Sequence, residues 1–257
     1  MQNVICHRAM KILSTIVLIF VESAASATDL VERREHIRNM ENKVTVESSE
    51  RKIRSERLLK ELNVPTISHL PVIVDSSVAL KRSKEEIALR AMTLLIVAVK
   101  AEGLEQEIVE KLIKDYELSN ELTPKEKKFT DNPSPSQFDK TQFIWRYESA
   151  WVLLWALGYV QVLSPPTQIC DVPRAVSFMQ QRNRDQFIRD SKLRSISEIL
   201  DETDLIYRYH WAVVDARVNG LQIPNEIDSS VVLERHYALN WLIGNIDQEW
   251  DDISTDT

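Results

Sequence analysis

The longest apolar stretches of the chain have the pattern of buried helices. Over residues 83–102 apolar side chains occupy most positions of a helical projection and leave little polar face. Residues 141–160 are more apolar still, and no charged residue occurs in the part from 150 to 160. A helix that is apolar on every side must be buried on every side. We therefore predict that residues 141–160 form one helix at the centre of the core.

Capping sequences predict where several helices begin. Ser83, Thr123 and Ser195 each stand three residues before a glutamate, which is the pattern of a capping box. Asp228 can cap a last helix. Helical spacing of apolar residues extends the prediction to further helices, which cover about residues 49–62, 108–116, 173–181, 196–219 and 229–243.

The composition supports the same fold class. No strand pattern or repeat is evident, and the chain has only four glycines, none of them in a Gly-x-Gly sequence. Dinucleotide-binding and phosphate-binding loops need clustered glycines and are therefore excluded. We predict a single compact all-α domain with several helices over about residues 51–250 and a largely buried central helix. Residues 251–257 are expected to form a frayed acidic tail.

The first residues resemble a secretory signal peptide. Arg8 and Lys11 precede an apolar run over residues 12–21, and Ala25-Ser26-Ala27 supplies a small-x-small cleavage site. The run is too short to span a bilayer. We expect residues 1–27 to be removed and residues 28–50 to form a charged, poorly ordered leader. The protein is then secreted or periplasmic, with no membrane span in the mature chain; the alternative is a cytoplasmic protein with an apolar N-terminus.

The overall charge limits the kinds of partner. A formal net charge of −7 argues against nucleic-acid binding, which depends on neutralising phosphates. The two cysteines exclude a disulfide framework, and we expect Cys170 to be buried or paired between chains. The basic stretch over residues 182–194 is expected to be a solvated connector; its alternative is a contact for an acidic partner.

Charged residues on apolar helices are the most informative feature for function. Glu148 lies on the most apolar helix, and Asp204 can pair with Arg208 because they are one helical turn apart. One interpretation is a structural network of ion pairs inside the core. The other is a ligand pocket between the last two helices and the Trp145 helix, where aromatic and charged side chains converge. The candidate ligand-binding residues are Arg146, Arg208, Trp211, Arg217, Arg235 and Trp241.

Catalytic and metal-binding motifs are absent from the sequence. His210 and His236 could hold a metal with nearby carboxylates, but both lie on apolar stripes, which favours core histidines. We predict no metal and no cofactor. If the protein is an enzyme, we expect a hydrolase that uses acid–base residues, and the candidates are Glu148, Asp204, His210, Asp215 and His236.

Several segments together resemble one bacterial family, the domain of unknown function 4272. They are SKEEIALRA (83–91), WRYE (145–148), WVLLWALG (151–158), CDV (170–172), LDETDLIYR (200–208), HWAVVDAR (210–217) and ERHYALNWL (234–242). The resemblance covers about residues 51–243 and implies a single helical domain. It implies no activity, cofactor or catalytic residue. We therefore expect a non-enzymatic helical module that binds a protein partner or a small-molecule ligand.

Overall fold

The computed structural model describes residues 44–245 and 248–257, and most of these residues are helical. The α-helices are α3 (Val46–Glu61), α4 (Lys84–Glu102), α5 (Gln106–Asp115), α6 (Pro124–Thr130), α7 (Gln137–Ile144), α8 (Arg146–Ala156), α9 (Val172–Gln180), α10 (Arg184–Asp190), α11 (Ile196–Val218) and α12 (Ser229–Leu242). The structure also has two single 3-10 turns. The first, η2 (Pro224–Glu226), lies between α11 and α12, and the second, η4 (Trp250–Asp252), follows α12. Within the described residues there is no strand, and the predicted all-α fold is confirmed. The predicted signal peptide and most of the charged leader lie outside the described residues.

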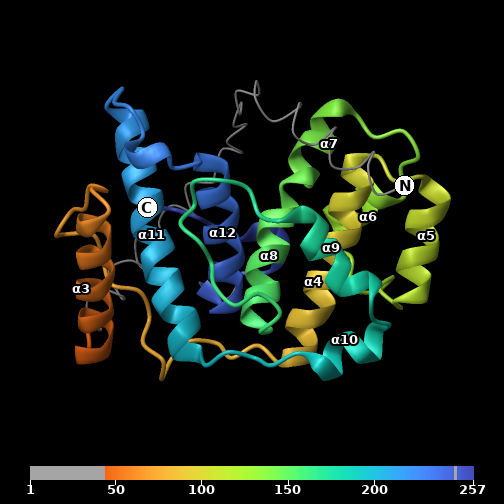
Figure 1. The fold of residues 1–257 in the computed structure, drawn as a ribbon, viewed down its shortest axis with the longest axis horizontal. Coiled ribbons are helices and arrows are strands. Elements are labelled where there is room, and N and C mark those ends of the chain that lie inside the picture. Colours follow the sequence, from red (N-terminus) through yellow and green to blue (C-terminus); the bar gives the residue numbers. More distant parts are fainter. Residues whose placement is uncertain (1–43, 246–247) are drawn as a thin grey trace.

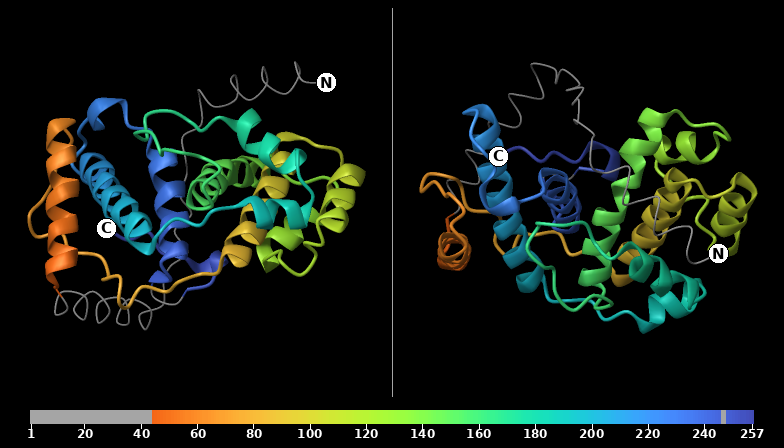
Figure 2. Two further views of the ribbon diagram at one scale, coloured as in Figure 1. Left: turned by 60° about the horizontal axis from the view of Figure 1, so that its bottom comes forward. Right: turned by 45° about the horizontal axis from the view of Figure 1, so that its top comes forward.

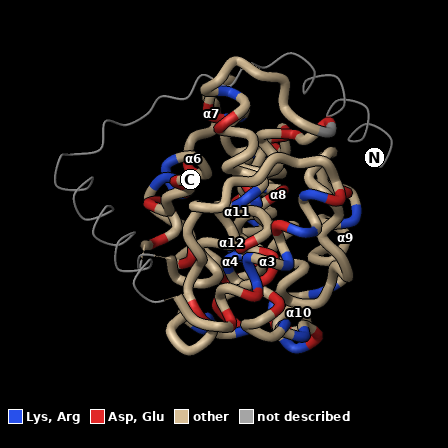
Figure 3. The backbone as a smooth tube through the Cα atoms, turned by 90° about the vertical axis from the view of Figure 1, so that its left-hand side faces the viewer, with Lys and Arg blue, Asp and Glu red and all other residues tan. Residues whose placement is uncertain are grey.

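The longer helices form a row that carries the core. Helices α3, α11, α12, α8 and α4 pack against one another in that order, as Figures 1 and 2 show. The shorter helices α5, α6, α7, α9 and α10 pack around α4 at the other end. Basic and acidic residues are interspersed along the backbone in this side view, without a segment of one sign (Figure 3). None of the described helices is long and apolar enough to cross a bilayer.

The predicted central helix is present but shorter than expected. Every residue of α8 from Tyr147 to Ala156 is buried, and its uncharged part from Ala150 onward has no polar face to present to solvent. The prediction of one helix over residues 141–160 is wrong at both ends. The chain turns at Trp145, where α7 ends and α8 begins. At the other end Gly158 adopts a left-handed conformation with φ 78° and closes the helix.

The linker that follows α10 explains why α8 stops there. The Lys192 amide donates to the Leu157 carbonyl at 2.7 Å, and the Arg194 amide donates to the Ala156 carbonyl at 2.9 Å. These bonds satisfy carbonyls that a helix end leaves without partners. The stretch predicted as a solvated connector over residues 182–194 thus contains α10 and the cap of the central helix.

The local start signals of the helices act as predicted, with one exception. Thr123 and Ser195 form complete capping boxes at α6 and α11. Ser83 caps α4, but Glu86 does not return to the Ser83 amide and instead accepts a hydrogen bond from Arg82. That exchange places Arg82 beside α12, where it becomes part of the site described below.

The C-terminal segment is packed against the domain and is not a frayed tail. Trp250, Ile253 and Ser254 are buried. The Trp250 ring lies edge-on to Tyr237 and Trp241 of α12, with centroids 5.2 and 5.4 Å apart. Buried Trp250 and Ile253 and a hydrogen bond of 2.8 Å from the Asn240 side chain to the Ser254 carbonyl hold this segment, although its acidic composition predicted the opposite.

Candidate functional site

The charged residues predicted to lie among the apolar helices form separate contacts. Asp204 and Arg208 make two hydrogen bonds of 2.9 and 2.8 Å, and both side chains are fully buried. Arg208 also donates to the Pro71 carbonyl at 3.3 Å and lies 3.6 Å from the Glu56 carboxylate on α3. The pair on α11 therefore ties that helix to α3 and to the segment that follows it.

A second closed contact joins α8 to α12. Glu148 accepts a hydrogen bond from the Cys170 amide and a second one, of 3.3 Å, from Nε of Arg235. Nη1 of the same arginine donates to the Ser164 carbonyl at 2.6 Å. Burial raises the pKa of Glu148, and the charge of Arg235 opposes that rise. Burial and the nearby Glu148 carboxylate raise the pKa of the Cys170 thiol well above its ordinary value. The predicted burial of Cys170 is confirmed, and the thiol is held neutral.

A third contact joins the same two helices nearer the start of α8. Arg146 donates to the Glu234 carboxylate at 2.9 and 3.1 Å, and the Ser149 hydroxyl donates to it at 2.6 Å. The Arg146 guanidinium also lies 4.9 Å from the centre of the Tyr237 ring. This arrangement again pairs a charged side chain with a carboxylate within the domain.

The two histidines of the last helices contact each other. The Nδ1 atoms of His210 and His236 are 2.8 Å apart, so one ring donates a proton and the other accepts it. Burial lowers the pKa of His210 to about 4. Burial and the neighbouring His210 lower the pKa of His236 well below its ordinary value. Both rings are therefore neutral near pH 7.

Of the remaining candidate residues, Arg217 acts on the histidine pair, because its charge helps to lower the pKa of His210. Asp215 accepts a hydrogen bond of 3.0 Å from the Asn219 amide, Trp211 is half-buried on α11, and Arg217 is exposed near the end of that helix. Of the five candidate catalytic residues, only the two histidines contact each other. In the described part of the chain no group of three or more His, Cys, Asp or Glu side chains is arranged to hold a metal ion.

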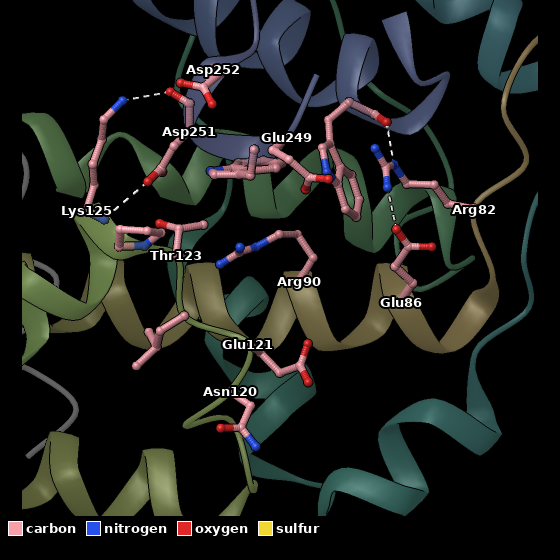
Figure 4. A pocket seen from close by; sticks show the side chains of 14 residues that line it. Arg82, Glu86, Arg90, Asn120, Glu121, Thr123, Lys125, Glu249, Asp251 and Asp252 are labelled. Carbon is pink, nitrogen blue, oxygen red and sulfur yellow. Dashed lines mark hydrogen bonds and ion pairs between the residues drawn. The ribbon is translucent and has the colours of Figure 1, made fainter. Parts of the chain in front are cut away.

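An open pocket lies elsewhere, between α4, the start of α6, α12 and the C-terminal segment (Figure 4). Its volume is about 650 Å³. Its charged and aromatic lining consists of Arg82, Arg90, Lys125, Glu86, Glu121, Glu249, Asp251, Asp252, Trp241 and Trp250. Asn120 and Thr123 add neutral polar groups. Trp241 is the one predicted ligand-binding residue that lines it.

One wall of the pocket consists of Arg82, which directly precedes the N-cap of α4, and of Glu86 and Arg90, which follow on α4 at four-residue intervals. Arg82 donates to Glu86 and, at 2.6 Å, to the Trp241 carbonyl. Its guanidinium carbon lies 4.0 Å from the centre of the Trp241 ring, a cation–π geometry. Arg82 is therefore paired with a carboxylate and a carbonyl of the domain.

Arg90 crosses the pocket between α4 and the segment that carries Glu249 (Figure 4). It forms a buried ion pair of 2.5 Å with Glu126, and its guanidinium lies 5.1 Å from the centre of the Trp250 ring. Glu126 also accepts the Thr123 amide at 2.9 Å, as part of the capping box of α6. The capping residue of α6 thus also neutralises the arginine of α4.

The opposite wall is fastened at Lys125. The Lys125 amide donates to the Asp251 carboxylate at 3.1 Å, and the Lys125 ammonium donates to the Asp251 carbonyl at 2.7 Å (Figure 4). These bonds hold η4 against the start of α6. The C-terminal segment is therefore a structural wall of the pocket.

Sequence reasoning missed most of this pocket. The four-residue spacing of Arg82, Glu86 and Arg90 was a visible signal, since one polar face on an otherwise apolar helix must meet polar partners or solvent. The combination of Trp250 with Asp251 and Asp252 near the end of the chain was a second signal. Because the C-terminal segment is acidic, it was expected to be frayed, and the anchoring role of Trp250 was not predicted.

Glu202 on α11 is a further residue that sequence reasoning did not single out. It is half-buried and forms no hydrogen bond with a described residue. Burial raises the pKa of Glu202 to about 7; the charge of Arg235 opposes the rise and that of Asp201 adds to it. Because the folded pKa exceeds the unfolded one, the folded state binds more protons, and stability falls as the pH rises from about 4.5 to about 7.

Glu202→Gln should therefore stabilise the protein selectively at alkaline pH. We expect the free energy of unfolding of the variant, relative to the wild type, to rise by about 2 kcal/mol between pH 4.5 and pH 8, after allowance for partial solvent screening. Urea denaturation at both pH values measures it. Glu198→Gln on the same helix is the control with the opposite sign, because hydrogen bonds from Ser195 lower the pKa of Glu198. A pH-independent difference for Glu202→Gln would contradict the assignment.

The fold and the pocket define the class of this protein: an all-α domain with a polar, tryptophan-containing pocket on one side of its helical row. The sequence assigns the family. Residues 51–253 match the model of the domain of unknown function (DUF4272), and the chain belongs to this family. No curated protein and no solved structure matches the chain.

Proposed function

We propose that this domain is a non-enzymatic binding module that holds a small molecule in the pocket between α4, α6, α12 and the C-terminal segment. The observation that carries the proposal is the open volume of about 650 Å³, which lies in the range of small-molecule sites. Tryptophans beside convergent charged groups are typical of such sites. None of the residues considered for acid–base catalysis lines this pocket, which favours binding over a reaction.

Filling the pocket should abolish binding. Asn120 is exposed at the pocket and has no unusual backbone conformation, so Asn120→Trp can add a ring without a folding defect. We expect at least one compound in a panel of small charged and neutral molecules to raise the thermal unfolding midpoint of the full chain. A ligand present at one hundred times its Kd adds about 2.7 kcal/mol of stability. The shift should be absent in Asn120→Trp.

The control places the same ring outside the pocket. Glu107 is exposed on α5, and Glu107→Trp should keep the full ligand-induced shift. Stabilisation that survives in Asn120→Trp would place the site elsewhere. A panel in which no compound stabilises the protein would count against the binding proposal itself.

A further inference from the structure

The helix at the end of the row is held to the domain mainly by polar side chains. Among the described helices, α3 packs chiefly on α11 (Figure 1). The buried residues of α3 are Ser48, Arg51, Ser55 and Leu59. Only Leu59 is apolar, whereas α8 buries a continuous apolar run over residues 150–156. Since the hydrophobic effect scales with buried apolar area, it contributes little to the docking of α3.

Ion pairs hold the first half of α3 to α11. The buried Arg51 donates to Glu47 on its own helix and, at 3.1 Å, to Asp201 on α11. Arg54 donates to the same Asp201 oxygen at 2.7 Å. One carboxylate of α11, itself 44% exposed, therefore receives two arginines of α3.

Polar contacts also hold the middle of α3. The Lys52 ammonium donates to the Ser68 and Leu70 carbonyls at 2.5 and 2.6 Å. Glu56 lies 3.6 Å from Nη1 of Arg208 on α11. When charged groups of this kind separate, water replaces their partners, so their separation costs far less than the exposure of apolar side chains.

The docked state leaves polar atoms of this interface without partners. Nη1 of Arg51, Nη1 of Arg208 and Oε1 of Glu56 are all buried and form no hydrogen bond. The distance of 3.6 Å between the last two atoms is too long for one. A buried polar atom without a partner is destabilising, and water would supply that partner if α3 moved away. These three atoms therefore lower the cost of separating α3 from α11.

We infer that α3 is a releasable arm, which undocks from α11 while the rest of the helical row stays folded. Its anchor is at its C-terminal end, where Leu59 and Val64 belong to the hydrophobic core. Release uncovers the face of α11 that carries Asp201, Asp204 and Arg208, which share one side of that helix. The inference is independent of the proposed ligand pocket, because α3 does not line that pocket.

Hydrogen exchange of the full chain, measured by mass spectrometry on peptides from α3 and α8, tests the inference. A free helix of 16 residues is marginal in water, so the amides of α3 exchange once it undocks. We expect them to exchange at least about 100-fold faster than those of α8, after correction for intrinsic rates. Low concentrations of urea should accelerate α3 much less than α8, because undocking exposes little apolar surface.

Asp201→Asn tests which contacts hold the arm. It should accelerate exchange of α3 about three- to five-fold and leave α8 unchanged, as expected for partly exposed ion pairs. Asp190→Asn on α10 is the matched control, because Asp190 also contacts two arginines, Arg182 and Arg189, and is 40% exposed. It should leave exchange of α3 unchanged.

Two results would overturn the inference. If α3 and α8 exchange at the same corrected rate and with the same urea dependence, α3 opens only when the whole domain unfolds. If Asp201→Asn leaves α3 unchanged, or accelerates α3 and α8 equally, the contacts with α11 do not control a separate opening of α3.

Discussion

Asp204→Ala is expected to lower the free energy of unfolding by about 3–5 kcal/mol, a large part of the stability of an ordinary domain. Asp204 and Arg208 are 0% and 1% exposed and make two hydrogen bonds with each other. Removing the carboxylate leaves the buried Arg208 guanidinium with the Pro71 carbonyl at 3.3 Å and the Glu56 carboxylate at 3.6 Å, neither of which replaces the two short hydrogen bonds to Asp204. The loss reflects a buried charge that keeps only the longer contact with Glu56 more than it reflects the net strength of the Asp204–Arg208 pair.

An exposed pair with the same spacing provides the control. Lys127 and Asp131 are also four residues apart on a helix, and their side chains are 60% and 62% exposed. Asp131→Ala should therefore change stability by less than about 1 kcal/mol in the same urea denaturation experiment. Replacing both members of the buried pair, as in Asp204→Leu with Arg208→Met, should recover most of the loss. A loss below 1 kcal/mol for Asp204→Ala alone would show that the pair does not hold α11 to α3.

Acidification is expected to destabilise the domain through its histidine pair. The folded pKa of His210 is about 4, below the ordinary value of 6.5, so the unfolded chain binds more protons than the folded one in this interval. The stability contributed by the neutral ring is complete above about pH 6.5 and is lost as the pH falls toward 4. For His210 alone this is about 3 kcal/mol. His236 acts in the same direction, because its pKa is lowered as well.

The double variant His210→Phe with His236→Phe isolates this effect. Its stability should change less between pH 6.5 and pH 4.5 than that of the wild type, by at least about 2 kcal/mol in urea denaturation. Glu202 contributes in the opposite direction over part of this range, so the difference between variant and wild type is the informative quantity. His69→Gln, at an exposed position, should leave the pH dependence unchanged. Equal pH dependence of the wild type and the double variant would refute the neutral pair.

Helix starts and the pairing of Asp204 with Arg208 could be predicted, because both depend on residues within one helical turn. Thr123 and Ser195 cap their helices through amides three residues away, and Asp204 meets Arg208 four residues later. The long helix expected over residues 141–160 failed for the opposite reason. Its break at Trp145 and its end near Gly158 depend on packing and on a linker that begins more than thirty residues later.

The candidate site could be predicted only in small part. Trp241 was identified because it lies among charged side chains on the last helix. The signals at Arg90 and Asp251, which are the four-residue spacing from Arg82 and the neighbouring Trp250, did not indicate which other elements these residues would meet. The capping-box pattern predicted that Glu86 accepts a hydrogen bond from the Ser83 amide, but in the structure Glu86 accepts one from Arg82. The nearby Trp241 carbonyl decides that outcome, because it gives Arg82 a second acceptor.

The amino-acid sequence alone determined that this protein is helical, which segment lies at its centre and which family it belongs to. These properties follow from apolar periodicity and from contacts within a single turn, and both can be recognised in a linear chain. Only the tertiary structure decided where the pocket lies. Arg82 meets Trp241 across 159 positions and Lys125 meets Asp251 across 126, and burial of the apolar faces of α4 and α12 brings these polar groups together. Such contacts depend on which helices pack side by side, and hydrophobic burial is too non-directional for local sequence to specify that.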